Sequence, residues 1–227
     1  MNILIVTIKS WHIDNFYRLK VKYPQMNWYL IDNKEFLDLE NIKNISPNYI
    51  FFPHWSWKIP KEIYENYTSI LFHMTDLPFG RGGSPLQNLI IREIYKTKIS
   101  AIKVEKDLDS GDIYLKKDLD ISLGSAQEIF IKMSDIIFFE MIPEIIENNI
   151  TPQPQKGNKI IFKRRTPQES DLLQLEHITK RKVYDFIRML DAEGYPKAFI
   201  KLNDELMIKF SEVHLKNNKL VGRFEIE

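Results

Sequence analysis

Cysteine is absent from the 227 residues of this sequence. Its absence excludes disulfide bonds, thiol nucleophiles and thiolate zinc sites, and it fits a reducing compartment. Long hydrophobic runs are absent too, because no stretch approaches the ~18 apolar residues of a membrane span. The apolar start at residues 2–6 lacks the basic residues and the cleavage site of a signal peptide. A cytoplasmic location is therefore expected.

An excess of either charge is also lacking. The 32 Lys and Arg residues are balanced by 31 Asp and Glu residues, which leaves a formal net charge of +1. A surface without net positive charge argues against nucleic acid and against a membrane as partners. No cluster of residues has metal-ligand spacing, so no metal is expected. The 44% of hydrophobic residues is enough for a globular protein with a sizeable core.

Apolar runs that alternate with helical patterns indicate the fold of the first 150 residues. Strands are expected at 3–8, 27–31, 50–52, 70–72, 100–104 and 113–115, and helices at 13–21, 62–64, 84–94 and 125–148. The loop at residues 9–12 lacks the glycines of a dinucleotide-binding fingerprint, so NAD is not expected. The alternation predicts an α/β fold, in which a Rossmann-like, mostly parallel sheet is covered by helices on both faces.

The composition changes after residue 149. Residues 151–158 have the proline, glycine and polar content of a connection. A helix at 182–190 then precedes predicted strands at 198–202, 206–214 and 220–226. The sequence therefore predicts one domain over residues 1–150, followed by a linker and a small C-terminal α+β domain over residues 151–227. The apolar C-terminal strands suit a homodimer interface or, alternatively, the core of the small domain itself.

Residues 69–88 have the order in which open α/β sheets present ligand sites. A buried strand leads into a polar loop rich in glycine, and a helix then begins at Ser84 and Pro85. His73 ends the strand and could move a proton near neutral pH, while Arg81 in the loop could bind phosphate or carboxylate. The alternatives are a structural role for His73 and a solvated surface charge for Arg81.

Two further loops carry residues that suit a site. Asp109 lies in an acidic turn beside a glycine, and pairing with His73 would fix the imidazole tautomer and support proton transfer. Its alternative role is that of a turn former. Residues 53–60 hold Trp55 and Trp57 between two prolines, which suits stacking of a flat ring ligand or, equally, packing in the core.

Four ordered segments between residues 73 and 199 resemble a known family. Residues 73–85, HMTDLPFGRGGSP, are similar to the HxSxLPxxRGxxP signature of the folate-dependent formyltransferases. These enzymes include methionyl-tRNA, glycinamide ribonucleotide and sugar N-formyltransferases. Residues 107–115, DLDSGDIYL, resemble the family's DxGxI loop. Residues 162–170 resemble the RRxPED end of its catalytic domain, and residues 187–199 resemble the RAxxxPYPGA opening of its C-terminal domain.

The resemblance implies that N10-formyltetrahydrofolate donates a formyl group to an amine, without a metal. His73 matches the family's essential histidine and would stabilise the tetrahedral oxyanion or shuttle a proton. Asp109 matches the essential aspartate, which would orient His73 and help to remove the amine's proton. The residues expected to hold the donor are Phe52, Pro53, Trp55, Ser56, Trp57, Asp107 and Gly111. Those expected to face the acceptor are Lys9, Trp11, Thr75, Arg81, Gly82 and Gly83.

One departure from the family pattern lies at position 71. The family usually has an asparagine two residues before the histidine, which completes the oxyanion site, whereas this sequence has Leu71. Leucine cannot donate a hydrogen bond, and losing one such donor can cost roughly 3–4 kcal/mol of barrier. His54, in the loop after the adjacent strand, is the expected catalytic replacement.

The expected acceptor is a nucleotide-linked 4-amino-4,6-dideoxy sugar, UDP-linked and of the pseudaminic acid type. The short C-terminal region and the neutral charge argue against a tRNA, and residues 53–60 and 72–85 resemble the sugar-modifying branch. The alternatives are a formyltetrahydrofolate hydrolase, a formyltransferase for another amine, and a sugar-nucleotide-binding module without catalysis. Donor turnover separates them: loss to water indicates a hydrolase, acceptor-dependent loss a transferase, and no loss a binder.

Overall fold

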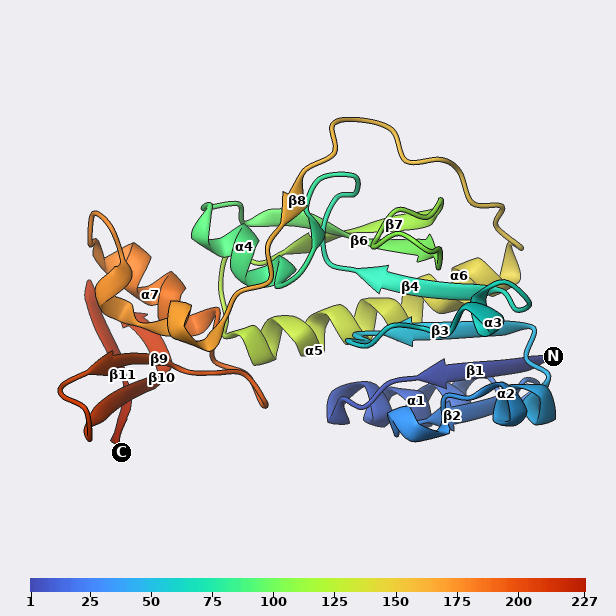
Figure 1. Ribbon diagram of the computed structural model, residues 1–227, viewed down its shortest axis with the longest axis horizontal. Coiled ribbons are helices and arrows are strands. Elements are labelled where there is room, and N and C mark those ends of the chain that lie inside the picture. The colour runs from blue at the N-terminus through green and yellow to red at the C-terminus, as the bar shows by residue number, and fades with distance from the viewer. The chain divides into compact units, whose positions relative to one another are not determined.

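Apolar, β-branched runs form a six-stranded sheet in the computed structural model, which describes residues 1–227 (Figure 1). The strand order is β2-β1-β3-β4-β6-β7. The bounds are β1 (Asn2–Val6), β2 (Asn27–Ile31), β3 (Tyr49–Pro53), β4 (Ser69–His73), β6 (Lys96–Lys103) and β7 (Ile113–Asp120). The first four strands in this order pair in parallel, and β6 runs antiparallel to β4. The predicted mostly parallel sheet is confirmed, and the reversal of β6 is the addition that the sequence did not indicate.

Both faces of this sheet are covered. On one face, Ile42 and Ile63 pack in a cluster with Leu4 and Phe52 of β1 and β3. The neighbouring strand residues point the other way and are equally inaccessible to solvent, as with Phe51. Strands buried on both faces lose their alternation of polar and apolar residues, which is why they appear in the sequence as unbroken apolar runs.

The helices follow the predicted pattern except for an additional helix, α2, which the sequence did not indicate, and one interruption. Their bounds are α1 (Ser10–Lys22), α2 (Leu39–Ile45), α3 (Lys61–Tyr64), α4 (Pro85–Ile91), α5 (Ala126–Ile136), α6 (Ile142–Glu147) and α7 (Lys180–Arg188). The single helix predicted at 125–148 is wrong in its middle, where a π-helical turn at Ile137–Met141 separates α5 from α6. Pro143 has no N–H to offer the carbonyl of Phe139, so the regular helical ladder cannot continue there. None of the helices is both long and apolar enough to cross a membrane.

The chain folds into two compact units. The first comprises residues 1–81, 98–119 and 131–161, and the second comprises residues 82–97, 120–130 and 162–227. A short pair, β5 (Arg81–Gly82) with β8 (Ile161–Phe162), forms a separate two-stranded sheet. Three 3-10 turns complete the element list, at Lys34–Phe36, Pro167–Ser170 and Leu172–Gln174. The domain boundary expected at residue 150 stays a prediction.

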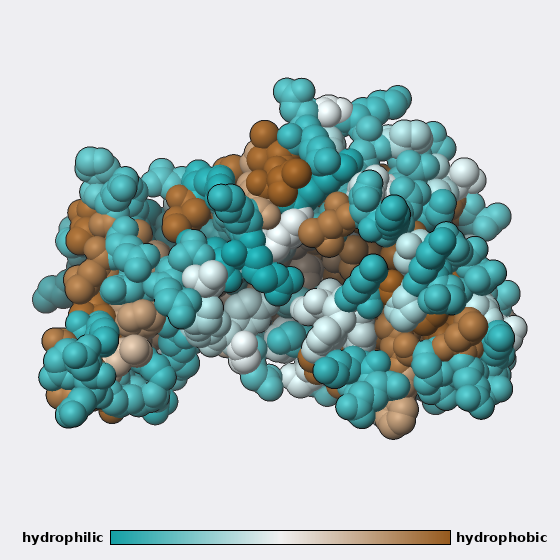
Figure 2. Space-filling view, in the orientation of Figure 1, coloured by the Kyte–Doolittle hydropathy of each residue, from teal (hydrophilic) through white to brown (hydrophobic).

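The C-terminal part of the second unit is an antiparallel sheet with α7 beside it (Figure 1). Its strands are β9 (Ala198–Lys201), β10 (Met207–Lys216) and β11 (Lys219–Ile226), and a bulge interrupts the β10–β11 register between Ser211 and His214. Several apolar side chains of this sheet stay exposed, among them Phe224 and Ile226 of the edge strand β11. Figure 2 shows apolar patches among the polar surface of this part of the chain. The homodimer stays a prediction.

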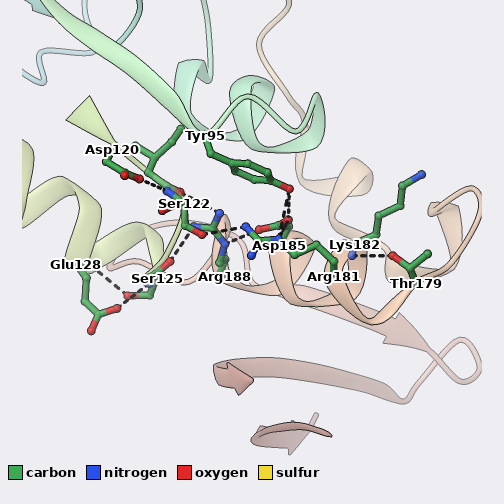
Figure 3. A network of polar contacts seen from close by, with 12 residues as sticks. Tyr95, Asp120, Ser122, Ser125, Glu128, Thr179, Arg181, Lys182, Asp185 and Arg188 are labelled. Carbon is green, nitrogen blue, oxygen red and sulfur yellow. Dashed lines mark hydrogen bonds and ion pairs between the residues drawn. The ribbon is translucent and has the colours of Figure 1, made fainter. Parts of the chain in front are cut away.

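A buried ion pair ties α7 into the second unit (Figure 3). Arg188 is almost inaccessible to solvent, and its Nε donates to Asp185 Oδ1 at 2.6 Å. Its two terminal nitrogens donate to the carbonyls of Gly124 and Ile121, each at 3.0 Å. The second oxygen of Asp185 accepts from the hydroxyl of Tyr95 at 2.7 Å. Every polar group of the pair therefore has a partner, which is the condition under which a buried ion pair is tolerated.

Removing the carboxylate tests this dependence. Asp185→Ala leaves the Arg188 guanidinium buried without a counter-charge, and we expect it to lower the free energy of unfolding by about 3–5 kcal/mol in urea titrations. The control is Asp204→Ala, since Asp204 pairs with Lys201 on the surface and its side chain is 99% exposed. That variant should stay within about 0.5 kcal/mol of the wild type. Equal effects of the two substitutions would contradict the argument.

Candidate active site

His73 stands at the carboxyl end of β4, buried between two oxygen atoms. Its Nε2 lies 2.8 Å from the carbonyl oxygen of Gly80. Its Nδ1 lies 3.5 Å from Oδ2 of Asp109, which is also buried. The structure therefore brings together the two residues that the sequence singled out, and it does so within one compact unit.

Asp109 reaches His73 by a different route from the one expected. Ser100 of β6 lies opposite His73, and Lys103 lies opposite Ile70. The last residue of β6 therefore lies near the start of β4, at the other end of the strand from His73. The loop that follows β6 must return toward the carboxyl end of β4 to place Asp109 there. The structure thus brings the two side chains together by way of the reversed β6, which the sequence did not indicate.

The return loop depends on two unusual backbone positions. Asp109 has a positive φ of 51°, a conformation that few residues other than glycine adopt without local support. A Cβ on Gly111 would lie 1.8 Å from the carbonyl oxygen of Lys103, so only glycine fits against β6 at that point. The glycine of the acidic turn is thus needed for close packing, and the turn holds the Asp109 carboxylate against His73.

The partners of His73 restrict where its protons lie. The Gly80 carbonyl can only accept, so a hydrogen bond at Nε2 requires an N–H there. Nδ1 and the Asp109 carboxylate would then both be acceptors unless a proton lies between them. The geometry therefore favours a pair with one shared proton, either imidazolium with carboxylate or imidazole with carboxylic acid. Such a pair can deliver or collect a proton at one place in the site.

Two residues expected to face the acceptor make hydrogen bonds within the protein, and their binding roles stay predictions. Thr75 is fully buried, and its hydroxyl donates to the same Gly80 carbonyl at 3.3 Å. Arg81 donates from Nε and Nη2 to the side-chain oxygen of Gln155, at 3.1 and 2.7 Å. In this arrangement Thr75 supports the loop that contacts His73, and Arg81 has two of its donors occupied.

Gln155 is the site residue that sequence analysis missed. Its Nε2 donates to the carbonyls of Asp109 at 2.9 Å and Gly111 at 2.8 Å, while its oxygen accepts from Arg81. The residue lies in the proline-rich stretch that the sequence indicated to be a connection. Nothing in that composition distinguishes a linker from a strap packed on a loop, so no sequence signal marked it.

A second buried histidine, His12, lies among three residues that were predicted for the site: Lys9, Trp11 and His54. The Trp11 ring lies 5.9 Å from that of His54, and the Lys9 ammonium lies 5.4 Å from the Trp11 ring. The ring of His12 lies 6.0 Å from His54, and its Nδ1 is 2.7 Å from the hydroxyl of Ser134. The group lies after β1 and β3, at the same sheet edge as His73. The role of His54 as the replacement for an asparagine stays a prediction.

Burial sets the charge state of both histidines in this group. It lowers the pKa of His54 from 6.5 to about 3, with the positive charge of Lys9 as the second cause. Burial also lowers the pKa of His12 well below 6.5, with His54 and then Lys9 adding to the effect. Both rings are therefore neutral at physiological pH. A neutral His54 can donate one hydrogen bond but carries no positive charge to an oxyanion.

The aromatic loop after β3 has one inward and one outward indole. Trp55 packs against the core cluster of the first unit, and its ring lies 6.3 Å from Phe52. The indole N–H of Trp55 is buried and has no hydrogen-bond partner. Trp57 meets Trp55 edge-on at 4.9 Å and remains 41% exposed. Trp55 thus packs against the core and Trp57 faces solvent, while stacking on a ligand stays a prediction.

The other residues expected to bind donor or acceptor have these positions. Pro53 is buried at the end of β3 and Ser56 is exposed, while the carbonyl of Asp107 accepts from the Ser110 hydroxyl at 2.9 Å. Gly82 and Gly83 belong to the second unit. A Cβ on Gly82 would lie 2.3 Å from the carbonyl oxygen of Phe162, so these glycines serve close packing of β5 on β8. Binding roles for all of these residues stay predictions.

Comparison with known proteins identifies the class of protein. A solved structure, that of methionyl-tRNA formyltransferase from Clostridium thermocellum, is 52% identical in sequence to this chain. The two superpose with a TM-score of 0.95 over 100% of this chain and 99% of that chain. HypX from Aquifex aeolicus in complex with tetrahydrofolic acid is 16% identical, with a TM-score of 0.76 over 94% of this chain and 38% of that one. This weaker likeness shows the fold alone. The fold is thus that of a formyltransferase.

The 52% identity over the full chain places the protein in the formyltransferase family that includes methionyl-tRNA formyltransferase. The family model of the methionyl-tRNA formyltransferase C-terminal domain matches residues 167–227. Among curated relatives, methionyl-tRNA formyltransferase of Bacillus licheniformis is 25% identical over 180 residues, which are 77% of this chain and 56% of that protein. The chain thus spans little more than half the length of this relative.

The predicted sugar-nucleotide acceptor is wrong, and so is the exclusion of nucleic acid. The 52%-identical structure and the C-terminal family match both carry the name of methionyl-tRNA formyltransferase. A sugar N-formyltransferase from Shewanella is only 16% identical, with a TM-score of 0.71 over 93% of this chain and 96% of that one, which shows the fold alone. The pseudaminic acid branch of the expected resemblance has no support in these comparisons.

One source of the error was the net charge, which averages over the whole surface. A polyanion is bound by cations that lie together, whatever the sum over the rest of the protein. Lys163 and Arg164 are adjacent and exposed after β8, and Lys180 begins α7 with its side chain in solvent. Their charge is hidden in the total of +1 by carboxylates elsewhere.

Acid should destabilise the protein through His54. The folded state keeps His54 neutral down to a pKa of about 3, whereas the unfolded chain takes up a proton below 6.5. The contribution of His54 to the free energy of unfolding is therefore fully present above pH 6.5 and is lost as the pH falls from 6.5 toward 3. We expect the wild type to lose about 2 kcal/mol more than His54→Gln between about pH 7 and pH 5 in urea unfolding.

The exposed His177 provides the matched control for that measurement. His177→Gln should keep the pH dependence of the wild type, since its ring lies in solvent in the folded state. A His54→Gln variant whose unfolding free energy depends on pH as steeply as that of the wild type would show that His54 is not held neutral by the fold.

Proposed function

We propose that this chain is a folate-dependent N-formyltransferase, which transfers the formyl group of N10-formyltetrahydrofolate to the amino group of methionyl-tRNA. The observation that carries the proposal is the buried pair of His73 and Asp109, 3.5 Å apart, in a chain of the formyltransferase family. The acceptor rests on the names of its relatives and on the family match at residues 167–227.

The transfer needs a group that both takes and returns a proton. The amine forms a bond to the formyl carbon as the bond from that carbon to the folate nitrogen breaks, and one proton passes from the amine to the leaving nitrogen. In the imidazolium–carboxylate form of the pair, the Asp109 carboxylate can accept the proton that the amine loses while Nδ1 of His73 keeps its own. A proton then passes to the folate nitrogen as it leaves, so the pair returns to its starting state. The Nε2–H of His73 is the donor for the developing oxyanion, which would displace the carbonyl of Gly80 as its partner.

The loop after β3 has features that fit a pterin ring. The folate donor supplies the activated formyl group. Trp57 offers a partly exposed indole face for stacking, and the buried N–H of Trp55 lacks a partner in the protein. Gly111 brings the backbone of the acidic turn close to β6. These residues suit a flat ligand with hydrogen-bonding edges.

The acceptor end of the proposal concerns the second unit. Lys163 and Arg164 are exposed and follow β8 directly, and cations of this kind meet phosphate groups of an RNA backbone. Arg165, the third cation of the run, is turned inward and bonds the carbonyl of Glu169. Two cations of this run are therefore exposed to solvent, and the third makes a hydrogen bond within the protein.

Donor turnover tests the chemistry. The protein should consume N10-formyltetrahydrofolate only when methionyl-tRNA is present and should leave N-formylmethionyl-tRNA, measured by release of tetrahydrofolate and by mass of the aminoacyl product. Asp109→Asn keeps the shape and removes the proton acceptor, so kcat should fall by about 10²–10⁴-fold, as it should for His73→Asn. His177→Asn is the control. Donor loss without acceptor would indicate a hydrolase, and no turnover at all would sink the proposal.

Salt dependence tests the acceptor. Replacing Lys163 and Arg164 together by alanine should weaken binding of methionyl-tRNA and reduce the slope of log K against log salt by about 1 for each phosphate group that the variant no longer binds. The matched control replaces Lys216 and Lys219, two exposed lysines paired on β10 and β11, and so removes the same charge. If both double variants bind like the wild type, these two cations do not contact tRNA.

A further inference from the structure

Gln155 bonds both the acidic turn and the start of β5 with one amide group. Its nitrogen donates to the carbonyls of Asp109 at 2.9 Å and Gly111 at 2.8 Å. Its oxygen accepts from Nε of Arg81 at 3.1 Å and from Nη2 at 2.7 Å. A reversed amide would set N–H groups against the guanidinium and an oxygen against two carbonyls, so only the observed orientation satisfies all four contacts.

The backbone around Gln155 is fixed as well. Gln153 and Ile113 exchange two backbone hydrogen bonds, of 2.8 and 2.9 Å, which place this stretch directly beside the acidic turn. The strap formed by residues 153–155 is thus paired at one end to the start of β7. At the other end it reaches Asp109 and Arg81 through one side chain.

Asp109 is the residue that needs this support. Its φ of 51° is costly for a residue with a Cβ, and such conformations persist only where neighbouring contacts determine them. Gln155 holds the carbonyls on both sides of Ser110, so it fixes the turn that aims the Asp109 carboxylate at His73. Arg81 in turn holds the Gln155 amide.

We infer that Gln155 is a positioning residue for the formyl transfer proposed above, acting through Asp109 and touching neither donor nor acceptor. The inference rests on that proposed function for its catalytic consequence. Its structural part concerns the conformation of the acidic turn and stands independently.

The sharpest variant is Gln155→Glu, which is nearly isosteric. It keeps oxygen atoms for Arg81 but loses both donors and sets a carboxylate against the carbonyls of Asp109 and Gly111. We expect kcat to fall by about 10²-fold, the effect of displacing a reacting group by about 1 Å, while KM for donor and acceptor changes by less than about threefold. Gln155→Ala, which removes the donors without adding repulsion, should lower kcat by less.

Gln153→Glu is the matched control, because it adds the same charge two residues away on an exposed side chain. It should retain wild-type kcat and KM. A kcat for Gln155→Glu equal to that of Gln153→Glu, or a loss of Gln155→Glu activity that appears in KM alone, would overturn the inference.

A readout without substrate separates this inference from the proposed function. Amide hydrogen exchange in residues 107–111 should be faster in Gln155→Glu than in the wild type, and unchanged in Gln153→Glu. If the wild type transfers no formyl group, the proposed function fails, and exchange still decides whether Gln155 holds the turn. Unchanged exchange in Gln155→Glu would overturn the inference even in an active enzyme.

Discussion

The candidate site depends on one buried contact, that of the His73 imidazole with the carboxylate of Asp109. A ring that also faces the carbonyl of Gly80 cannot satisfy both neighbours without an extra proton on the pair. The protein keeps this proton away from bulk water, since both residues are buried. Proton transfer in the site is therefore limited to a group that can reach the pair, which is the restriction that an acyl transfer needs.

Most of the surrounding structure serves to make that contact. β4 delivers His73, and the reversed β6 carries the chain away from it, so the acidic turn must bring it back. Gly111 allows the turn to pack tightly on β6, and Gln155 secures it from the other side. The Gly80 carbonyl is held by the Thr75 hydroxyl while it bonds His73.

Sequence reasoning succeeded where the signal was local and failed where it was not. Unbroken apolar runs marked the strands, and the order of polar residues after them marked His73 and Asp109. The direction of β6 could not be predicted, because an apolar run packs equally well in either sense. The π-helical turn before Pro143 was missed, since the apolar spacing on both sides of it still suits a helix. Gln155 was missed because the stretch around it has the composition of a linker, and because the residues it contacts lie far away in the sequence.

The acceptor was misjudged for a related reason. The residues proposed to handle the formyl group lie close together on a strand end and one turn, so a short signature can identify them in one chain. Recognition of a large acceptor uses side chains spread over a surface. The net charge of the whole chain says little about the charge of any one patch of that surface. Structures of this fold carry names as different as HypX, a sugar N-formyltransferase and methionyl-tRNA formyltransferase. The fold alone therefore does not decide the acceptor, and neither the signature nor the net charge decides which acceptor this chain takes.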